Sequence, residues 1–181
     1  MIRSFGAKSP KIHPTAFVSE AAYVVGDVEI GEGSSIWPGV IIRGNGHKIK
    51  IGKYVNIQDN CVVHNDSDAT YGDYVTLGHH VMCHAKTVET HTLIGNGAVI
   101  NGDAIIGHHS IVAAGSVVLE RVEIPPHSFV VGAPAEVRRA TTDRHHQMIE
   151  GTAKNYHLNG QLFREAGLQD PDQEKFSDPN V

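Results

Sequence analysis

The chain has 181 residues, of which 40% are hydrophobic, so its length and composition fit one globular domain of ordinary size. The net charge is −5 with histidines counted as neutral, and acidic and basic residues are interspersed, which argues against nucleic acid or a membrane surface as a partner. Residues 1–14 lack the apolar stretch of a secretory signal, no run approaches the ~20 apolar residues of a membrane span, and the two cysteines form no disulfide or CxxC pattern, so we expect a cytoplasmic protein.

One aliphatic or other apolar residue recurs every six positions over most of the chain, between Ile12 and Val130. A period of six fits neither a helix nor one alternating strand, but it suits short strands separated by corners. Three such strands make a coil of about eighteen residues, and successive coils stack at ~4.8 Å so that their backbones pair. The sequence therefore predicts an all-β fold for residues 1–140, a single-stranded parallel β-helix of six to seven coils. The predicted inward positions are Ile12, Val18, Val24, Ile30, Ile36, Ile42, Ile51, Ile57, Val63, Tyr71, Leu77, Cys83, Val88, Ile94, Ile100, Ile106, Val112, Val118, Ile124 and Val130.

The sequence changes character after Ala140, where apolar residues fall at helical spacing and Thr or Asp is available as an N-cap. We predict a C-terminal α-helix within residues 141–168, packed along the β-helix and weakened by Gly151 and Gly160. Residues 169–181 are polar and contain prolines, so we expect a poorly ordered, flexible tail. The helical face is formed by Met148, Ile149, Thr152, Tyr156 and Phe163.

The chain contains thirteen histidines, which invites a search for metal ligands. His64 follows inward Val63 and His84 follows inward Cys83, so both occupy the same outward position, one coil plus a small bulge apart. His79 belongs to the preceding hexad and projects from a different side, near a corner. In a three-fold assembly, His79 of one subunit can face the His64–His84 pair of the next, which would complete a metal site of three imidazoles between subunits.

Other histidines are weaker candidates. His80 should point away from His79 along a strand, and adjacent residues rarely face one ion. We therefore expect the pairs His108–His109 and His145–His146 to occupy exposed polar positions.

Several short motifs occur in order along residues 10–140: Arg43-Gly44, Asn56-Ile57-Gln58-Asp59, a single His64, and Gly78-His79 with His84 five residues later. In this pattern the chain resembles the γ-class carbonic anhydrases, within the hexapeptide-repeat superfamily. The resemblance implies a left-handed β-helix and a homotrimer with metal sites between subunits. Two features differ from the family pattern: Asn45 stands where Asp is usual, and an extended acidic loop after His64 is absent.

The resemblance also implies a reaction. Zn²⁺, or Fe²⁺ or Co²⁺ in its place, would be held by His64, His79 and His84, and metal-bound hydroxide would attack CO₂ to give bicarbonate. Gln58 would orient the nucleophile or substrate, and Tyr156 would close the site from the C-terminal helix. Arg43 and Asp59 resemble residues that fix the geometry of the site or of the interface.

Two other functions remain open from the sequence. One is a metal-binding hexapeptide-repeat protein with little or no hydratase activity. The other is a CoA-dependent acyltransferase, because this fold carries that chemistry too. The set of three histidines discriminates against the transferase, which uses a lone catalytic histidine. Arg43 could also serve as an intersubunit salt bridge, and Tyr156 as a core residue of the helix.

Overall fold

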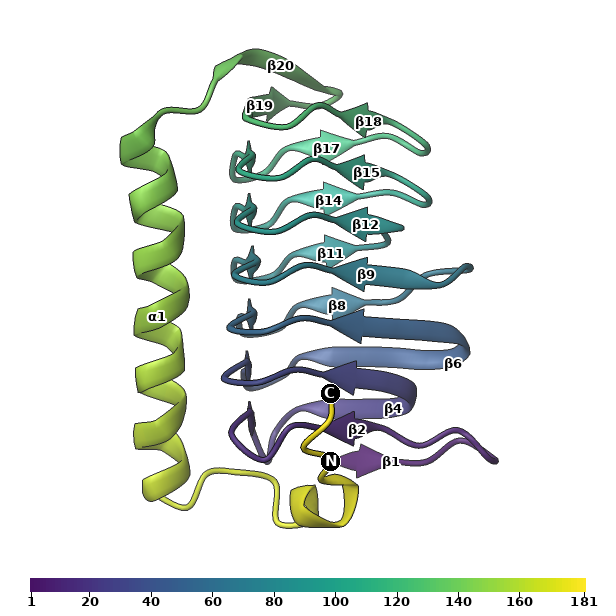
Figure 1. Ribbon diagram of the computed structural model, residues 1–181. Helices are drawn as coiled ribbons and strands as arrows, with labels where there is room; N and C mark the ends of the chain where they lie inside the picture. Colours follow the sequence, from purple (N-terminus) through teal and green to yellow (C-terminus); the bar gives the residue numbers. More distant parts are fainter.

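The chain winds into a left-handed β-helix of about seven coils with one long helix beside it, as the computed structural model of residues 1–181 shows (Figure 1). The strands pair in parallel from coil to coil, and only the last pair, β19 with β20, is antiparallel. Two sheets result, one of 12 strands and one of 8. The architecture predicted from the six-residue period is therefore confirmed.

The 8-stranded sheet forms one side of the triangular coil, which we call side 1. Its strands are β3 (Phe17–Val18), β5 (Ser35–Ile36), β7 (Asn56–Ile57), β10 (Thr76–Leu77), β13 (Leu93–Ile94), β16 (Ile111–Val112), β19 (Ser128–Gly132) and β20 (Ala135–Ala140).

The 12-stranded sheet forms the other two sides, because β4 and β6 run around the corner between them. Side 2 contains β1 (Ile2–Arg3), the first halves of β4 (Tyr23–Ile30) and β6 (Ile41–Ile51), β8 (Val62–Val63), β11 (Met82–Cys83), β14 (Val99–Ile100) and β17 (Val117–Val118). Side 3 contains β2 (Lys11–Ile12), the second halves of β4 and β6, β9 (Ala69–Tyr71), β12 (Thr87–Val88), β15 (Ile105–Ile106) and β18 (Glu123–Ile124).

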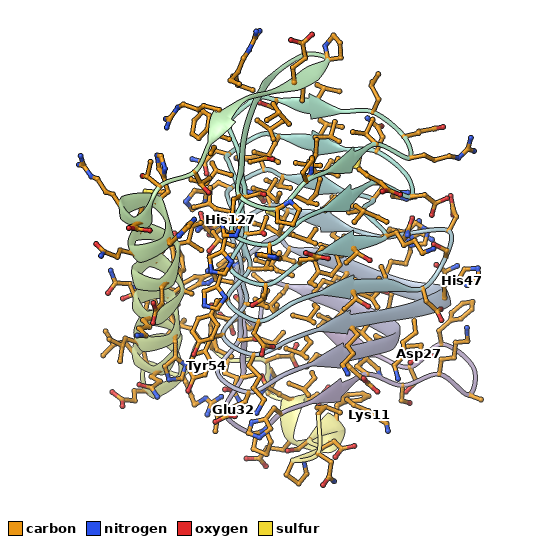
Figure 2. The ribbon with its side chains drawn as sticks, turned by 45° about the horizontal axis from the view of Figure 1, so that its top comes forward. Lys11, Asp27, Glu32, His47, Tyr54 and His127 are labelled. Atoms are coloured by element: carbon orange, nitrogen blue, oxygen red, sulfur yellow. The ribbon has the colours of Figure 1, made fainter.

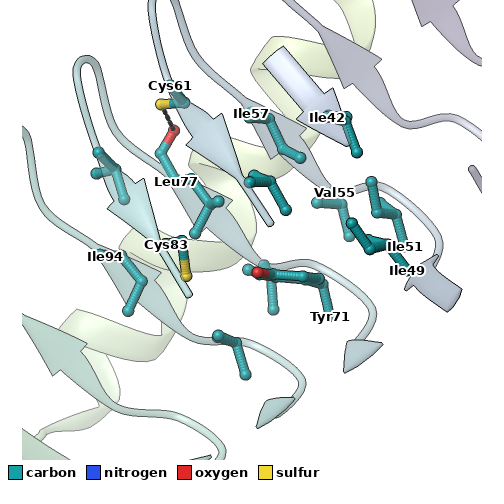
Figure 3. Packing of buried hydrophobic residues seen from close by; sticks show 14 of the residues in the cluster. Ile42, Ile49, Ile51, Val55, Ile57, Cys61, Tyr71, Leu77, Cys83 and Ile94 are labelled. Carbon is teal, nitrogen blue, oxygen red and sulfur yellow. Dashed lines mark hydrogen bonds between the residues drawn. The ribbon is translucent and has the colours of Figure 1, made fainter. Parts of the chain in front are cut away.

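The core is a column of inward side chains that runs the length of the β-helix. Every predicted inward residue is at most 5% exposed, and one continuous cluster of 35 buried residues includes them all. Tyr71 and Cys83 lie among the aliphatic side chains of this column (Figure 3). Burial raises the pKa of the Cys61 thiol to about 12 and also raises the pKa of Cys83, so both cysteines stay protonated and act as core residues.

Helix α1 (Asp143–Glu165) runs antiparallel to the coil axis and packs on side 1 (Figure 1). Thr142 is its N-cap, and the backbone N–H of Thr142 donates to His145 Nδ1 at 2.9 Å. The helix continues through both glycines. At Gly160 a Cβ would lie 3.1 Å from the Phe17 Cβ, so the missing side chain permits close packing rather than interrupting the helix.

An aromatic cluster holds α1 against side 1. The Trp37 ring lies 5.3 Å from the Tyr156 ring and 4.9 Å from the Phe163 ring, both in edge-on geometry. Phe17 completes the cluster at 5.6 Å from Trp37. Edge-on aromatic pairs add to the burial of apolar area, so this cluster fixes the helix at the height of Tyr156. No helix of the chain is long and apolar enough to span a membrane.

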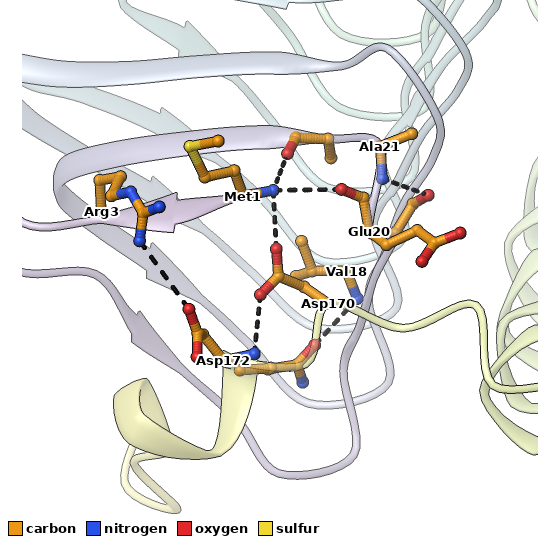
Figure 4. A network of polar contacts seen from close by, with 10 residues as sticks. Met1, Arg3, Val18, Glu20, Ala21, Asp170 and Asp172 are labelled. Atoms are coloured by element: carbon orange, nitrogen blue, oxygen red, sulfur yellow. Dashed lines mark hydrogen bonds and ion pairs between the residues drawn. The ribbon is translucent and has the colours of Figure 1, made fainter.

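The last segment of the chain differs from the flexible tail predicted for residues 169–181. A short 3-10 helix (Gln173–Phe176) folds under the first coil, where the buried Gln173 amide donates to the Ala16 carbonyl and accepts from the Val18 N–H. Asp170 is 4% exposed, and its carboxylate lies 2.7 Å from the Met1 ammonium (Figure 4). The end of a stack leaves backbone groups unpaired, and this segment satisfies several of them, which composition alone did not reveal.

A pair of neighbouring residues tests the register of the coils. Ile42 is fully buried, whereas Ile41 beside it is 42% exposed. We expect Ile42→Ala to lower the free energy of unfolding by about 2–5 kcal/mol, because it leaves a cavity in the core column. Ile41→Ala should cost below about 1 kcal/mol. Urea denaturation measures both values, and equal losses would contradict the register.

Candidate metal centre

His64 and His84 lie one above the other at the corner between sides 2 and 3. His64 follows β8 and His84 follows β11, and these strands pair with Val63 opposite Cys83. Because both preceding side chains point inward, both imidazoles point outward. The ring centroids are 5.1 Å apart and the ring planes meet at 74°. The predicted stacking of the two histidines is therefore confirmed.

The His64 ring is fixed by the backbone of the coil below. His64 Nδ1 lies 2.7 Å from the carbonyl oxygen of Arg43, in β6. A carbonyl oxygen only accepts, so Nδ1 carries the hydrogen of this bond. In the neutral ring, Nε2 then presents its lone pair outward, which is the arrangement that metal-binding histidines use.

Asp66 joins this pair, although the sequence analysis did not single it out. One ligand atom from each of His64, Asp66 and His84 lies within 4.8 Å of the others. The Asp66 carboxylate is 3.6 Å from His64 Nε2, and its side chain is 89% exposed. The sequence could have indicated Asp66, because it lies two positions after His64 in the irregular segment between β8 and β9. We call His64, Asp66 and His84 the first half-site.

His79 lies at a different corner, between sides 1 and 2. A Cβ at Gly78 would come within 2.3 Å of Asn96 Oδ1, so only glycine fits there. The same Asn96 oxygen accepts from the His79 backbone N–H at 3.1 Å. The Gly78-His79 step is therefore explained by an asparagine of the next coil, which fixes the backbone that carries the imidazole.

Asp59 orients the His79 ring from the coil below. His79 Nδ1 lies 3.0 Å from Asp59 Oδ2, so Nδ1 donates to the carboxylate and Nε2 is left free. Tyr156 lies nearby on α1: burial raises its pKa, and the negative charge of Asp59 raises it further. We call His79 and Asp59, with Tyr156 beside them, the second half-site.

Gln58 is buried in a line of amide and hydroxyl groups on side 1. Its amide nitrogen donates to Asn56 Oδ1 at 3.0 Å, and Asn56 donates in turn to the Thr76 hydroxyl at 2.8 Å. Gln58 is therefore held rigidly next to Asp59 in the chain, but it bonds to none of the three histidines.

The structure thus divides the predicted site residues of one chain between two corners. His64 and His84 converge, and the group they form includes Asp66 but not His79. Each half-site has at least one imidazole whose Nδ1 contacts a fixed acceptor and whose Nε2 makes no hydrogen bond. The three histidines predicted to share one ion therefore do not lie together within one chain.

The chain is similar to proteins named as carbonic anhydrases. Gamma carbonic anhydrase 2, mitochondrial, of Arabidopsis thaliana is 41% identical over 157 residues, covering 82% of this chain and 56% of the relative, so the chain spans just over half of that protein. The carbonic anhydrase of Geobacillus kaustophilus is 37% identical over 166 residues, covering 91% of each chain. The chain belongs to the γ-class carbonic anhydrase-like family. No family model matches it.

The fold of this γ-class carbonic anhydrase-like chain is shared with transferases. A hexapeptide transferase family protein from Anaplasma phagocytophilum superposes with a TM-score of 0.87 at 32% identity, covering 90% of this chain and 98% of that one. Fold alone therefore does not select the reaction, and the side chains of the site must.

Asn45 replaces the aspartate that the family pattern places after Arg43-Gly44. In this γ-class carbonic anhydrase-like chain the Asn45 amide oxygen accepts from Arg43 Nη1 at 2.6 Å. The contact still orients the guanidinium but leaves its charge unneutralised. Arg43 is exposed, so its positive charge lies at the surface. The backbone carbonyl of the same residue contacts His64 Nδ1.

The contacts of His64 and His79 predict the tautomer of each ring in the metal-free protein. In the neutral state, His64 and His79 should both carry hydrogen on Nδ1, because their partners only accept. His13 is a matched control of opposite tautomer, since its Nδ1 accepts from the Thr15 N–H at 3.2 Å. Long-range ¹H–¹⁵N NMR correlations, assigned with His64→Gln and His79→Gln, report the tautomers above the pH at which imidazole is protonated. Hydrogen on Nε2 of His64 would contradict the arrangement.

Proposed function

We propose that the protein is a metal-dependent, carbonic anhydrase-like hydratase that converts CO₂ to bicarbonate at a site between the subunits of a homotrimer. The observation that carries the proposal is the His64–His84 pair, with ring centroids 5.1 Å apart and with His64 Nδ1 held by a backbone carbonyl. The carbonic anhydrase relatives at 37% and 41% identity support the reaction class.

The donor set fits a zinc ion, with iron or cobalt as substitutes. His64 and His84 of one subunit and His79 of the next would hold it, because neutral imidazoles suit all three metals. A divalent ion on three imidazoles lowers the pKa of a coordinated water to ~7, which supplies the nucleophile that hydration of CO₂ requires.

The residues of the chain have separate tasks in this proposal. Asp59 holds His79 by its Nδ1, and the Arg43 carbonyl holds His64 in the same manner, so that each ring keeps its Nε2 directed at the ion. Gln58, rigid through Asn56, is positioned to orient substrate through its amide. Tyr156 excludes water from the edge of the site, because its ring packs on Trp37 and its hydroxyl stays protonated.

An acyltransferase is the second candidate, because the Anaplasma neighbour belongs to a transferase family. Release of free CoA from acetyl-CoA in the presence of amine or hydroxyl acceptors tests it directly. We expect none above background. Transfer that survives removal of the metal would support this candidate instead.

Stopped-flow CO₂ hydration tests the proposed reaction. We expect His64→Ala to lower kcat/KM by about 100-fold or more, since even partners of metal ligands contribute about 10–100-fold. His47→Ala is the matched control, because His47 is an exposed histidine in β6 that belongs to neither half-site. It should leave the rate unchanged. A rate in the His64→Ala variant equal to that of the parent protein would remove the hydratase proposal.

Mixing two inactive variants tests whether the site is shared between subunits. His79→Ala trimers and His84→Ala trimers each lack one ligand at every site. After random exchange of subunits, about three-quarters of the trimers are mixed, and each mixed trimer contains one complete site of three. About a quarter of the parent activity should therefore return.

The result of this mixing separates two arrangements. If all three ligands came from one chain, every chain in the mixture would lack a ligand and no activity would return. Size-exclusion chromatography with light scattering verifies that both variants remain trimers and exchange subunits.

A further inference from the structure

The third corner of the β-helix, between sides 3 and 1, carries a column of aromatic rings that the hydratase does not use. Five successive coils each place one ring there, and consecutive ring centroids are 5.2, 4.7, 4.9 and 5.2 Å apart. All five residues have positive φ, between 53° and 60°. Figure 2 shows the two ends of the column, Tyr54 and His127, at the edge that faces α1. In order, the rings belong to Tyr54, Tyr74, His91, His109 and His127.

At the upper end of this column three histidines converge. His108 Nδ1 lies 3.0 Å from His109 Nδ1, and the His108 and His127 ring centroids are 4.9 Å apart. One ring nitrogen from each of the three lies within 4.8 Å of the others. The sequence analysis placed the adjacent pair at exposed polar positions, whereas the two rings lie together and are half-buried. Neighbouring side chains diverge in an extended strand, but His109 has φ 57° at a corner, which turns its ring toward His108.

The start of α1 covers this cluster. The His146 ring lies 4.8 Å from the His109 ring and 5.3 Å from the His127 ring. The Thr141 hydroxyl donates to the His109 carbonyl at 2.8 Å and lies 3.0 Å from His146 Nε2. His108 and His109 are half-buried as a result. The three histidines are therefore packed against one another and against the start of α1, and are not three independent surface side chains.

We infer that His108, His109 and His127 form a second metal site, which binds a divalent transition ion such as Zn²⁺ or Ni²⁺ and fastens the start of α1 to the last coils. Imidazole is the preferred ligand of these ions among side chains without sulfur or charge. An ion at ~2.0–2.1 Å from each nitrogen places neighbouring nitrogens about 3.4 Å apart in tetrahedral geometry. The 3.0 Å separation of His108 and His109 lies near that spacing, and His127, which is exposed, closes on the ion by rotation of its side chain.

Burial, and then the nearby His91 and other imidazoles, lower the pKa of His109 to about 4. The alternative arrangement, in which one Nδ1–H donates to the other Nδ1 and no ion binds, uses the same distance and has to be separated by experiment.

The second site is distinct from the hydratase centre, because it lies on the corner that neither half-site occupies. The proposed ligands also differ in every residue. Failure of the hydratase proposal would therefore leave this inference standing, and its own failure would leave the hydratase standing.

Zinc titration of the full-length protein tests the inference, with stoichiometry measured by equilibrium dialysis and elemental analysis. We expect two ions per chain for the parent protein and one for His127→Asn, whose remaining second-site affinity should fall by about 100-fold or more. Asparagine tolerates the positive φ of His127, so the backbone should persist. His91→Asn is the matched control, because His91 has φ 54° in the same column but lies outside the cluster, and it should keep both ions.

A variant without the first pair of histidines distinguishes zinc binding at the second site from zinc binding at the first. The double variant His64→Ala, His84→Ala should bind one ion per chain, and Zn²⁺ should raise its melting temperature because the ion binds only the folded chain. Adding His127→Asn should abolish both effects. A zinc stoichiometry that is the same in the parent protein and in His127→Asn, or an equal loss of zinc in His91→Asn and His127→Asn, would overturn the second site.

Discussion

The fold and both clusters of histidines depend on the register in which the coils stack. An inward residue on one coil pairs with an inward residue on the next, as Val63 does with Cys83, and the residue after each one must then point outward at the same height along the side. Backbone pairing sets the distance between such residues at ~4.8 Å. The ring separations of 5.1 Å for His64 and His84 and 4.9 Å for His91 and His109 follow from that constraint. Any residue type repeated at the coil period therefore becomes a column of close side chains.

The three corners of the triangle use this constraint for different purposes. One corner places His64 above His84, the second holds His79 against Asp59, and the third stacks rings beneath α1. The first two corners each present a histidine whose ring is oriented by the coil below. The third corner brings three imidazoles together within one chain. The same backbone thus separates His79 from the His64–His84 pair and gathers His108, His109 and His127 at one place.

The inward column and the stacking of His64 on His84 could be predicted because both depend only on counting residues. The Asp59–His79 contact and the His108–His109 contact could not, since they depend on how each corner turns the backbone. Histidine is enriched at positive φ, but a histidine alone does not show which corner adopts it, as His80 and His109 do. The course of the last segment could not be predicted for another reason. Its polar composition indicated a solvent-exposed segment. Gln173 instead hydrogen-bonds to backbone groups of Ala16 and Val18, which the open end of the stack leaves unpaired. Gly160 was likewise taken as a weak point of the helix, whereas its missing side chain permits the close approach of Phe17.

Helix α1 connects the two histidine clusters mechanically. Its first turns rest on His109 and His127 through His146, and its middle rests on Trp37 through Tyr156, next to Asp59. A helix is stiff over this length, because each backbone bond is made within the segment. Contacts that fix its start therefore also restrict the position of the Tyr156 ring beside the second half-site. The start of the helix over His109 and His127 and the Tyr156 ring beside Asp59 are therefore parts of one rigid element.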